Sequence, residues 1–171
     1  MKEIRSLMDY IDTISERSGK IVRWLIIALV AVVAGDVIAR YVFNRPSIWG
    51  YDTALYIYSY FFLLGGAYVQ RQRAQIRVDV LFNRFPPRAR VAIEIFFFLA
   101  FYFPVCIVFM WYGGKAAAHS FAIKEISNLS PWGEPVGPLR AAIPLAFFLL
   151  FLQGIAEFIR HLVFLVKGKQ L

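Results

Sequence analysis

Long stretches of apolar residues alternate with short clusters of charged residues along this chain of 171 residues. A helix needs about 20 apolar residues to cross the ~30 Å hydrocarbon core of a membrane, and four of the stretches are long enough. They predict helices over residues 21–43, 49–70, 91–112 and 139–166. The pattern therefore predicts an all-α integral membrane protein with four transmembrane helices in a single membrane domain, residues 1–171.

Charged residues set the extent of the first apolar stretch. Its uncharged centre, residues 24–35, corresponds to only ~18 Å of helix, which is shorter than the hydrocarbon core. The helix must therefore continue through Asp36 and Arg40. These two residues stand four positions apart on one helical face, so we expect them to form an ion pair near the far membrane interface.

Two other segments show the spacing of amphipathic helices. Residues 1–20 carry apolar side chains at helical intervals with charges on the rest of the wheel, and residues 78–85 repeat this spacing inside a basic loop, residues 71–90. Both patterns predict interfacial helices that lie flat on the membrane surface. Residues 113–137 predict a long loop on the opposite side, and Pro104 should kink the third transmembrane helix.

Lysine and arginine are distributed unequally between the two sides of the predicted bundle. Of the 19, fourteen lie on the side of the termini and five on the other. Because cytoplasmic loops carry the excess of these residues, we expect both termini in the cytoplasm. The net charge of +8 thus reflects topology, and nucleic acid is not an expected partner. The side chains expected to anchor the chain in the phospholipid bilayer are Trp49, Tyr51, Arg71, Arg73, Arg77, Arg84 and Trp132.

The sequence carries no pattern typical of catalysis. It has no Gly-rich phosphate loop, no metal-ligand spacing and no nucleophile motif. The two histidines, His119 and His161, are predicted on opposite sides of the membrane, which argues against a haem-binding cytochrome. We therefore expect a protein that is not an enzyme and that has no cofactor, catalytic or metal site.

Charged residues in or beside the apolar stretches are the remaining candidates. Asp52 begins the second predicted helix, where it can interact with the helix dipole or pair with Arg40 or Arg45. Glu157 and Arg160 are three positions apart and should pair at the cytoplasmic end of the last helix. We interpret the following residues as structural ion pairs or subunit-packing residues: Asp36, Arg40, Asp52, Glu157 and Arg160.

Asp36 also supports an alternative hypothesis. A charged residue inside the bilayer is a candidate for function by default, and Asp36 could be the essential acid of a self-sufficient, proton-coupled small transporter. Transporters that move substrate by themselves usually contain inverted repeats or broken helices, and no internal repeat is evident here. Replacing Asp36 by Asn separates the hypotheses, because a proton relay predicts loss of coupling and a structural pair predicts loss of assembly.

Several short motifs resemble those of a known family. They are residues 40–46 followed by Trp49 and Asp52, then residues 65–67, then residues 76–81, and finally an Ile-Pro-Leu sequence that opens the last apolar stretch. In this order and spacing they resemble the small membrane subunit of tripartite ATP-independent periplasmic (TRAP) transporters, over most of the chain from the first predicted span onward.

The resemblance implies a location in the bacterial inner membrane and two protein partners. One is a large transmembrane permease subunit, which holds the substrate and sodium sites and moves as an elevator beside a static small subunit. The other is a periplasmic substrate-binding protein that delivers organic acids. The outer loops would receive this binding protein, and the residues expected to contribute to its docking are Arg45, Lys115, Lys124, Glu125 and Glu134.

Overall fold

A computed structural model describes residues 2–72, 86–128 and 131–167. This part of the chain is almost entirely helical, which confirms the predicted all-α class. Its elements in chain order are the α-helices α1 (Lys2–Tyr41), α2 (Gly50–Arg71) and α4 (Pro87–Phe97), the π-helical turn η1 (Phe98–Tyr102), and the α-helices α5 (Phe103–Ala122) and α6 (Val136–Lys167).

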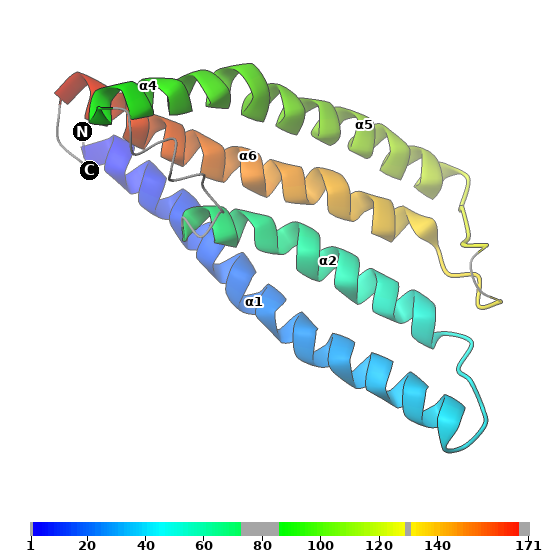
Figure 1. Ribbon diagram of the computed structural model, residues 1–171. Helices are drawn as coiled ribbons and strands as arrows, with labels where there is room; N and C mark the ends of the chain where they lie inside the picture. The colour runs from blue at the N-terminus through cyan, green and yellow to red at the C-terminus, as the bar shows by residue number, and fades with distance from the viewer. Residues whose placement is uncertain (1, 73–85, 129–130, 168–171) are drawn as a thin grey trace.

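The helices form a row in which α6 lies between α5 and α2, and α2 lies between α6 and α1 (Figure 1). Near its start, α1 also reaches α6. The connections from α1 to α2 and from α5 to α6 lie at one end of the row, which we call the loop end (Figure 1). The start of α1 and the end of α6 lie at the opposite end, which we call the terminal end (Figure 1).

Three helical rods among the described residues are long and apolar enough to cross a membrane: Met8–Tyr41, Arg88–Ala122 and Val136–Leu165. The fourth rod, α2, has 22 residues and is therefore ~33 Å long. Its five tyrosines and Asp52 make it less apolar than the others. The row thus contains the four rods that the sequence predicted, and the crossing of the membrane by α2 stays a prediction.

The segment 1–20 and the first apolar stretch, expected as separate helices, are one helix in the structure. α1 runs through 40 residues without interruption. Gly19 stands at the expected junction, where a Cβ atom would lie only 2.4 Å from a ring carbon of Tyr68. The glycine therefore permits a close approach between α1 and α2 and does not end the helix. Nearer the N-terminus, Met8 packs against Ala156 of α6, so tertiary contacts hold the N-terminal part of α1 in place.

The third rod consists of α4, η1 and α5 in continuous succession. A π-helical turn ends two residues before Pro104, where the sequence predicted a kink. Proline lacks an N–H group, and its ring crowds the carbonyl four residues earlier, which belongs to Ala100 inside η1. The wider π-helical turn is a recognised way to accommodate such an interruption.

The chain buries little of its apolar surface within itself. In the most apolar stretch of 18 residues, 6% of the residues are buried in α1 and 6% in the rod of α4, η1 and α5, compared with 33% in α6. The buried residues of α6 include three alanines, Ala142, Ala146 and Ala156, whereas large side chains such as Trp24 and Phe62 are exposed. α6 is therefore the central helix, and much of the row presents apolar surface to lipid or to another protein.

Part of the predicted basic loop cannot be compared with the structure. The interfacial helix expected at residues 78–85, together with Arg73, Arg77 and Arg84, lies outside the described residues.

Candidate functional sites at the two ends of the bundle

Arg160 joins two helices at the terminal end. Its guanidinium donates hydrogen bonds to Asp12 of α1 at 2.5 Å and to Glu157 of α6 at 2.9 Å. All three side chains are largely buried. Charges in an apolar environment must be paired to be tolerated, so this arrangement fastens the N-terminal part of α1 to the end of α6.

Two further contacts extend the arrangement. Gln153 of α6 is fully buried; it accepts a hydrogen bond from the hydroxyl of Ser15 at 2.7 Å and donates its amide to Asp12 at 3.2 Å. At the end of α2, Arg71 lies 2.7 Å from Glu16 and 3.9 Å from Asp12. Arg71 thus links α2 to α1, and its expected role as a membrane anchor stays a prediction.

We refer to these residues together as the Arg160 cluster: Asp12, Ser15, Glu16, Arg71, Gln153, Glu157 and Arg160. Four of them, Asp12, Arg71, Glu157 and Arg160, border a polar cavity of about 280 Å³ together with Gln72. Lys20 also pairs with Glu16, at 2.6 Å. The three carboxylates of Asp12, Glu16 and Glu157 are thus matched by three cations, which are Arg71, Arg160 and the neighbouring Lys20. The cluster joins α1, α2 and α6.

Sequence reasoning identified Glu157 and Arg160 but missed the α1 side of this cluster. The buried positions of α1 are Met8, Ile11, Ser15, Gly19 and Val22, which recur every three or four residues. The stripe begins with large apolar residues and continues with a hydroxyl and a glycine. The helical spacing of Ser15 and Gly19 with the apolar residues was the available signal that this face meets another helix.

Asp36 organises the turn between α1 and α2 at the loop end. It accepts a hydrogen bond from Arg40 at 3.0 Å, another from the backbone N–H of Ser47 at 3.2 Å, and a third from the Ser47 hydroxyl. The Ser47 oxygen in turn accepts the N–H of Gly50 at 3.1 Å, at the first residue of α2. The carboxylate therefore ties the end of one helix to the start of the next.

A second ion pair closes the connection between α5 and α6. Arg140 of α6 donates to Glu125 at 2.7 Å and to the hydroxyl oxygen of Ser120 at 2.7 Å. The Ser120 hydroxyl lies 2.8 Å from Glu125 as well. Within the connection, Ile126 and Pro135 form an antiparallel bridge, so the loop is a closed structure.

Tyrosines of α2 reach this same connection. The Tyr56 hydroxyl donates to the carbonyl of Pro135, and the Tyr60 hydroxyl donates to the carbonyl of Pro138 at 2.6 Å. Buried tyrosine hydroxyls require such partners. The polar character that lowers the hydropathy of α2 is thus used to attach α2 to the start of α6.

Asp52 and Glu134 bring two carboxyl groups together under the loop. Asp52 is fully buried, and Glu134 is 6% exposed. Burial, followed by the hydrogen bond and the negative charge of Asp52, raises the pKa of Glu134 to about 7. Asp52 occupies the first turn of α2, as the helix-dipole interpretation requires, but the proximity of Glu134 was not anticipated. Only the fold of the loop brings the two acids together.

The residues expected to dock a partner fall into two groups. Arg45, Lys115 and Lys124 have exposed side chains at the loop end, although Lys115 also lies over the ring of Trp111. Glu125 and Glu134, in contrast, are engaged within the loop structure. Of the aromatic side chains expected as membrane anchors, Trp49, Tyr51 and Trp132 are exposed.

Among residues 2–72, 86–128 and 131–167, no three His, Cys, Asp or Glu side chains converge in a way that could hold a metal ion. The described residues at the two ends of the bundle instead form networks of hydrogen bonds and ion pairs that join the helices.

Comparison with known proteins gives two findings. Residues 12–164 match the family described as tripartite ATP-independent periplasmic transporters, DctQ component. The chain is also similar to the sialic acid TRAP transporter permease protein SiaT of Haemophilus influenzae (strain 86-028NP), with 27% identity over 151 residues. This similarity covers 86% of the chain but only 23% of the length of that relative.

Proposed function

The chain belongs to the DctQ-component family of TRAP transporters, and from this premise we propose a specific role for it. It is the small permease subunit of a sodium-driven secondary transporter that depends on a periplasmic substrate-binding protein and imports organic acids. It acts as a static scaffold for a large elevator subunit and helps to receive the binding protein.

The exposed apolar surface of the row is the observation that carries the scaffold role. Of the three rods that are apolar enough to span a membrane, α6 buries 33% of its most apolar stretch and the two outer rods bury 6% each. A row of helices with so small a core gains stability by packing against a larger membrane protein. The Arg160 cluster fastens three of its helices together, which suits a component that must keep its shape while a neighbour moves.

The proposed topology places the terminal end in the cytoplasm and lets all four rods cross the inner membrane. Four crossings return the chain to its starting side, in agreement with the shared location of the start of α1 and the end of α6 (Figure 1). Single cysteines introduced at Ser6 and at Lys124 in a Cys106→Ala background would test this. We expect impermeant thiol reagents in intact cells to label position 124 from outside and to leave position 6 unlabelled; the reverse pattern contradicts the topology.

Docking of the binding protein is assigned to the exposed cations of the loop end. Arg45 and Lys124 lie on the two connections that would face the periplasm, whereas Lys115, expected in a loop over residues 113–137, lies in the last two turns of α5, which continues to Ala122. Exposed charges of one sign mainly accelerate the encounter with a partner of opposite charge. The proposal therefore includes an acidic surface on the binding protein where it meets this end.

The alternative of a self-sufficient transporter depends on proton exchange at Asp36. The contacts of Asp36 with Ser47 and Arg40 support an anchoring role, because its oxygens are already committed to holding the turn. Asp36→Asn retains an oxygen that can accept from Ser47 but loses the charge that pairs with Arg40, so we expect weaker assembly, with substrate uptake persisting in the transporter that does assemble. Loss of a proton dependence of uptake in this variant would support the alternative.

Reconstitution tests the function as a whole. The chain would be purified from membranes in a mild detergent, and we expect a large apolar protein to accompany it. In liposomes, uptake of an organic acid should require this chain, the large subunit, the binding protein and a sodium gradient together. Uptake by the chain alone, or by the other two proteins without it, would overturn the proposal.

A further inference from the structure

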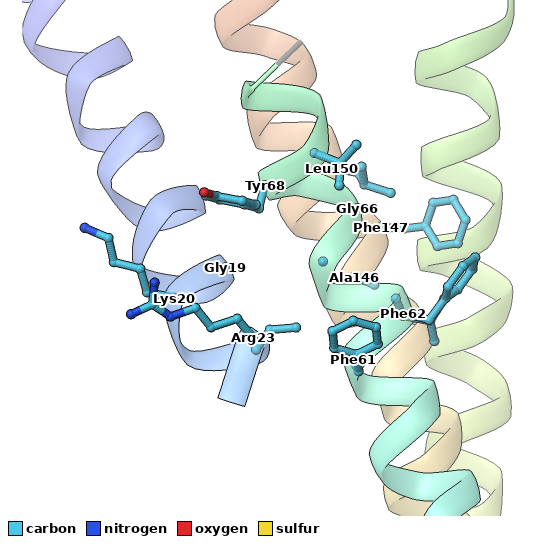
Figure 2. Close-up of a pocket in the computed structure, with 14 residues that line it drawn as sticks. Gly19, Lys20, Arg23, Phe61, Phe62, Gly66, Tyr68, Ala146, Phe147 and Leu150 are labelled. Carbon is cyan, nitrogen blue, oxygen red and sulfur yellow. The ribbon is translucent and has the colours of Figure 1, made fainter. Parts of the chain in front are cut away.

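A groove of about 690 Å³ lies between α1, α2 and α6, near the terminal half of the row (Figure 2). Its floor includes Gly65 and Gly66 of α2 and Leu150 of α6. A Cβ atom at Gly65 would meet only Val22, at 3.9 Å, so the absence of a side chain at this position leaves real space. The groove is therefore a consequence of two adjacent glycines on the face of α2 that meets its neighbours.

The lining of the groove differs between its sides. On α2 and α6 it is formed by aromatic and aliphatic side chains, among them Phe61 and Phe62. On α1 it is bordered by Lys20 and Arg23. The distance along α2 from Val69 to Phe61 is ~12 Å. The groove thus combines a cationic rim with an apolar interior.

The two rim cations differ in their partners. Lys20 pairs with Glu16 at 2.6 Å, and Glu16 also accepts from Arg71. Arg23 lies 5.7 Å from the ring centroid of Trp24 and has no carboxylate partner among the described residues. Being three positions apart, Lys20 and Arg23 are neighbours on the surface of α1. Figure 2 shows their side chains together on the α1 side of the groove, with Phe61 and Phe62 on α2.

We propose that this groove binds one anionic phospholipid, with an acyl chain over Gly65 and Gly66 and the phosphate on Arg23 and Lys20. The stems of the two cations border the groove while their charged ends are directed away from its apolar interior (Figure 2), as long basic side chains commonly are in membrane proteins. An anionic lipid supplies the negative charge that Arg23 lacks and the apolar chain that the interior requires. This inference goes beyond the transport role, because it assigns a lipid site to the chain itself.

The dimensions favour an acyl chain over a transmembrane helix. A helix that spans the membrane is a cylinder of roughly 2,400 Å³, from a diameter of ~10 Å and a length of ~30 Å. The groove is less than a third of that volume. A helix could place only a few side chains in it, and it would bring an apolar surface to Arg23 at the rim. A phospholipid supplies both an acyl chain for the apolar interior and a phosphate for the two cations on α1.

Photolabelling in lipid nanodiscs provides the test. The full chain, in its native complex, would be placed in nanodiscs that contain phosphatidylglycerol with a photoreactive acyl chain or the corresponding phosphatidylcholine. We expect labelling of the peptide that contains residues 61–69, with a preference for phosphatidylglycerol. Arg23→Gln should reduce that preference about fivefold, and the double variant with Lys20→Gln should reduce it further, since each cation contributes separately to the attraction.

Matched variants distinguish labelling by a lipid bound in the groove from labelling by the surrounding bilayer. Gly65→Leu fills the groove and should abolish the labelling, whereas Gly114→Leu on α5, where nothing lies within 4 Å, should leave it unchanged. Arg88→Gln, an exposed cation of α4 outside the groove, serves as the control for charge. Equal labelling by the two lipids, or labelling that survives Gly65→Leu, overturns the proposal. If Gly65→Leu does not fold, the two exposed cation variants decide the outcome.

The competing occupant is a segment of another protein. A photo-crosslinking amino acid in place of Phe62, in the native complex, should yield adducts with lipid. Crosslinks to a polypeptide at this position would show that a protein fills the groove and would contradict the lipid site, while leaving the proposed transport function intact.

Discussion

The two ends of the bundle are fastened in different ways. At the terminal end, Arg160 and Asp12 join residues 148 positions apart in the chain, and Ser15 and Gln153 join residues 138 apart. At the loop end, the ion pairs are local: Asp36 and Arg40 are 4 apart, and Glu125 and Arg140 are 15 apart.

This difference separates two tasks. Long-range ion pairs and hydrogen bonds hold α1, α2 and α6 in one arrangement, and loss of Arg160 would leave the largely buried Asp12 and Glu157 without their shared cation. The ion pairs at the loop end each lie within or beside one connection, while Tyr56 and Tyr60 attach α2 to the connection before α6. In the proposed function, the terminal end keeps the helices in a fixed arrangement, and the exposed cations Arg45, Lys115 and Lys124 at the loop end receive the binding protein. Four predictions test this contrast.

Arg160→Met should produce the largest effect. It keeps the apolar stem and removes the charge, so that Asp12 and Glu157 lose their shared cation in a largely buried site. Loss of one partner from such a pair costs about 3–5 kcal/mol. We expect a corresponding fall in the free energy of unfolding, measured by titration with a denaturing detergent. Arg17→Met, at an exposed position of α1, is the control and should change it by less than about 0.5 kcal/mol.

Replacing Gly19 or Gly35 of α1 by alanine should affect stability differently, because only Gly19 is packed against another helix. At Gly19 the new Cβ would lie 2.4 Å from the root of the Tyr68 ring, which cannot swing away, so Gly19→Ala should cost about 1–3 kcal/mol. At Gly35 nothing lies within 4 Å, and Gly35→Ala should be neutral or stabilise the helix by up to about 1 kcal/mol. Thermal midpoints of the two variants in the same detergent provide the comparison; equal midpoints would contradict it.

The loop end should respond to pH through Glu134. Its pKa is raised from 4.5 to about 7 in the folded protein, so the folded loop holds the proton more tightly than the unfolded loop does. The stability from this group is present below about pH 4.5 and is lost as the pH rises through 7. Hydrogen exchange of the Ser127 and Val136 amides should accelerate over this range, by at most about tenfold per pH unit beyond the intrinsic rate.

Glu134→Gln is the matched control for the pH dependence. The amide cannot ionise, so the additional acceleration of exchange should disappear while the exchange at the terminal end stays as it was. Retention of the full pH dependence in this variant would assign it to another group.

Charge reversal at the exposed cations should have the smallest effect on stability. We expect Lys124→Glu to change the free energy of unfolding by less than about 0.5 kcal/mol. It should slow association with the binding protein severalfold, and the difference from the unmodified chain should shrink at high salt. Surface plasmon resonance with the complex in nanodiscs would measure this. Arg17→Glu at the terminal end is the control, and an equal slowing there would contradict the assignment of docking to the loop end.

The apolar pattern predicted the rods well because the need to match a hydrocarbon layer acts on each stretch separately. The pattern also located Asp36 beside Arg40 and Glu157 beside Arg160, since these pairs lie within one helical turn. The pattern wrongly separated residues 1–20 from the first span. In the sequence, a charged residue that faces solvent cannot be told from one that faces a neighbouring helix. Only the contact of Met8 with α6 distinguishes the two cases.

By itself, the sequence determined the class of protein, its helical rods, the family and the local ion pairs, because hydropathy, motif order and helical spacing act over short distances. The tertiary structure alone decided that Asp12 meets Arg160, that Glu134 lies against Asp52, and that Gly65 opens a groove rather than a packed contact. These features depend on which faces of separate helices meet. In a chain whose surface is apolar on nearly every side, hydrophobicity does not mark those faces, and the few buried polar groups do.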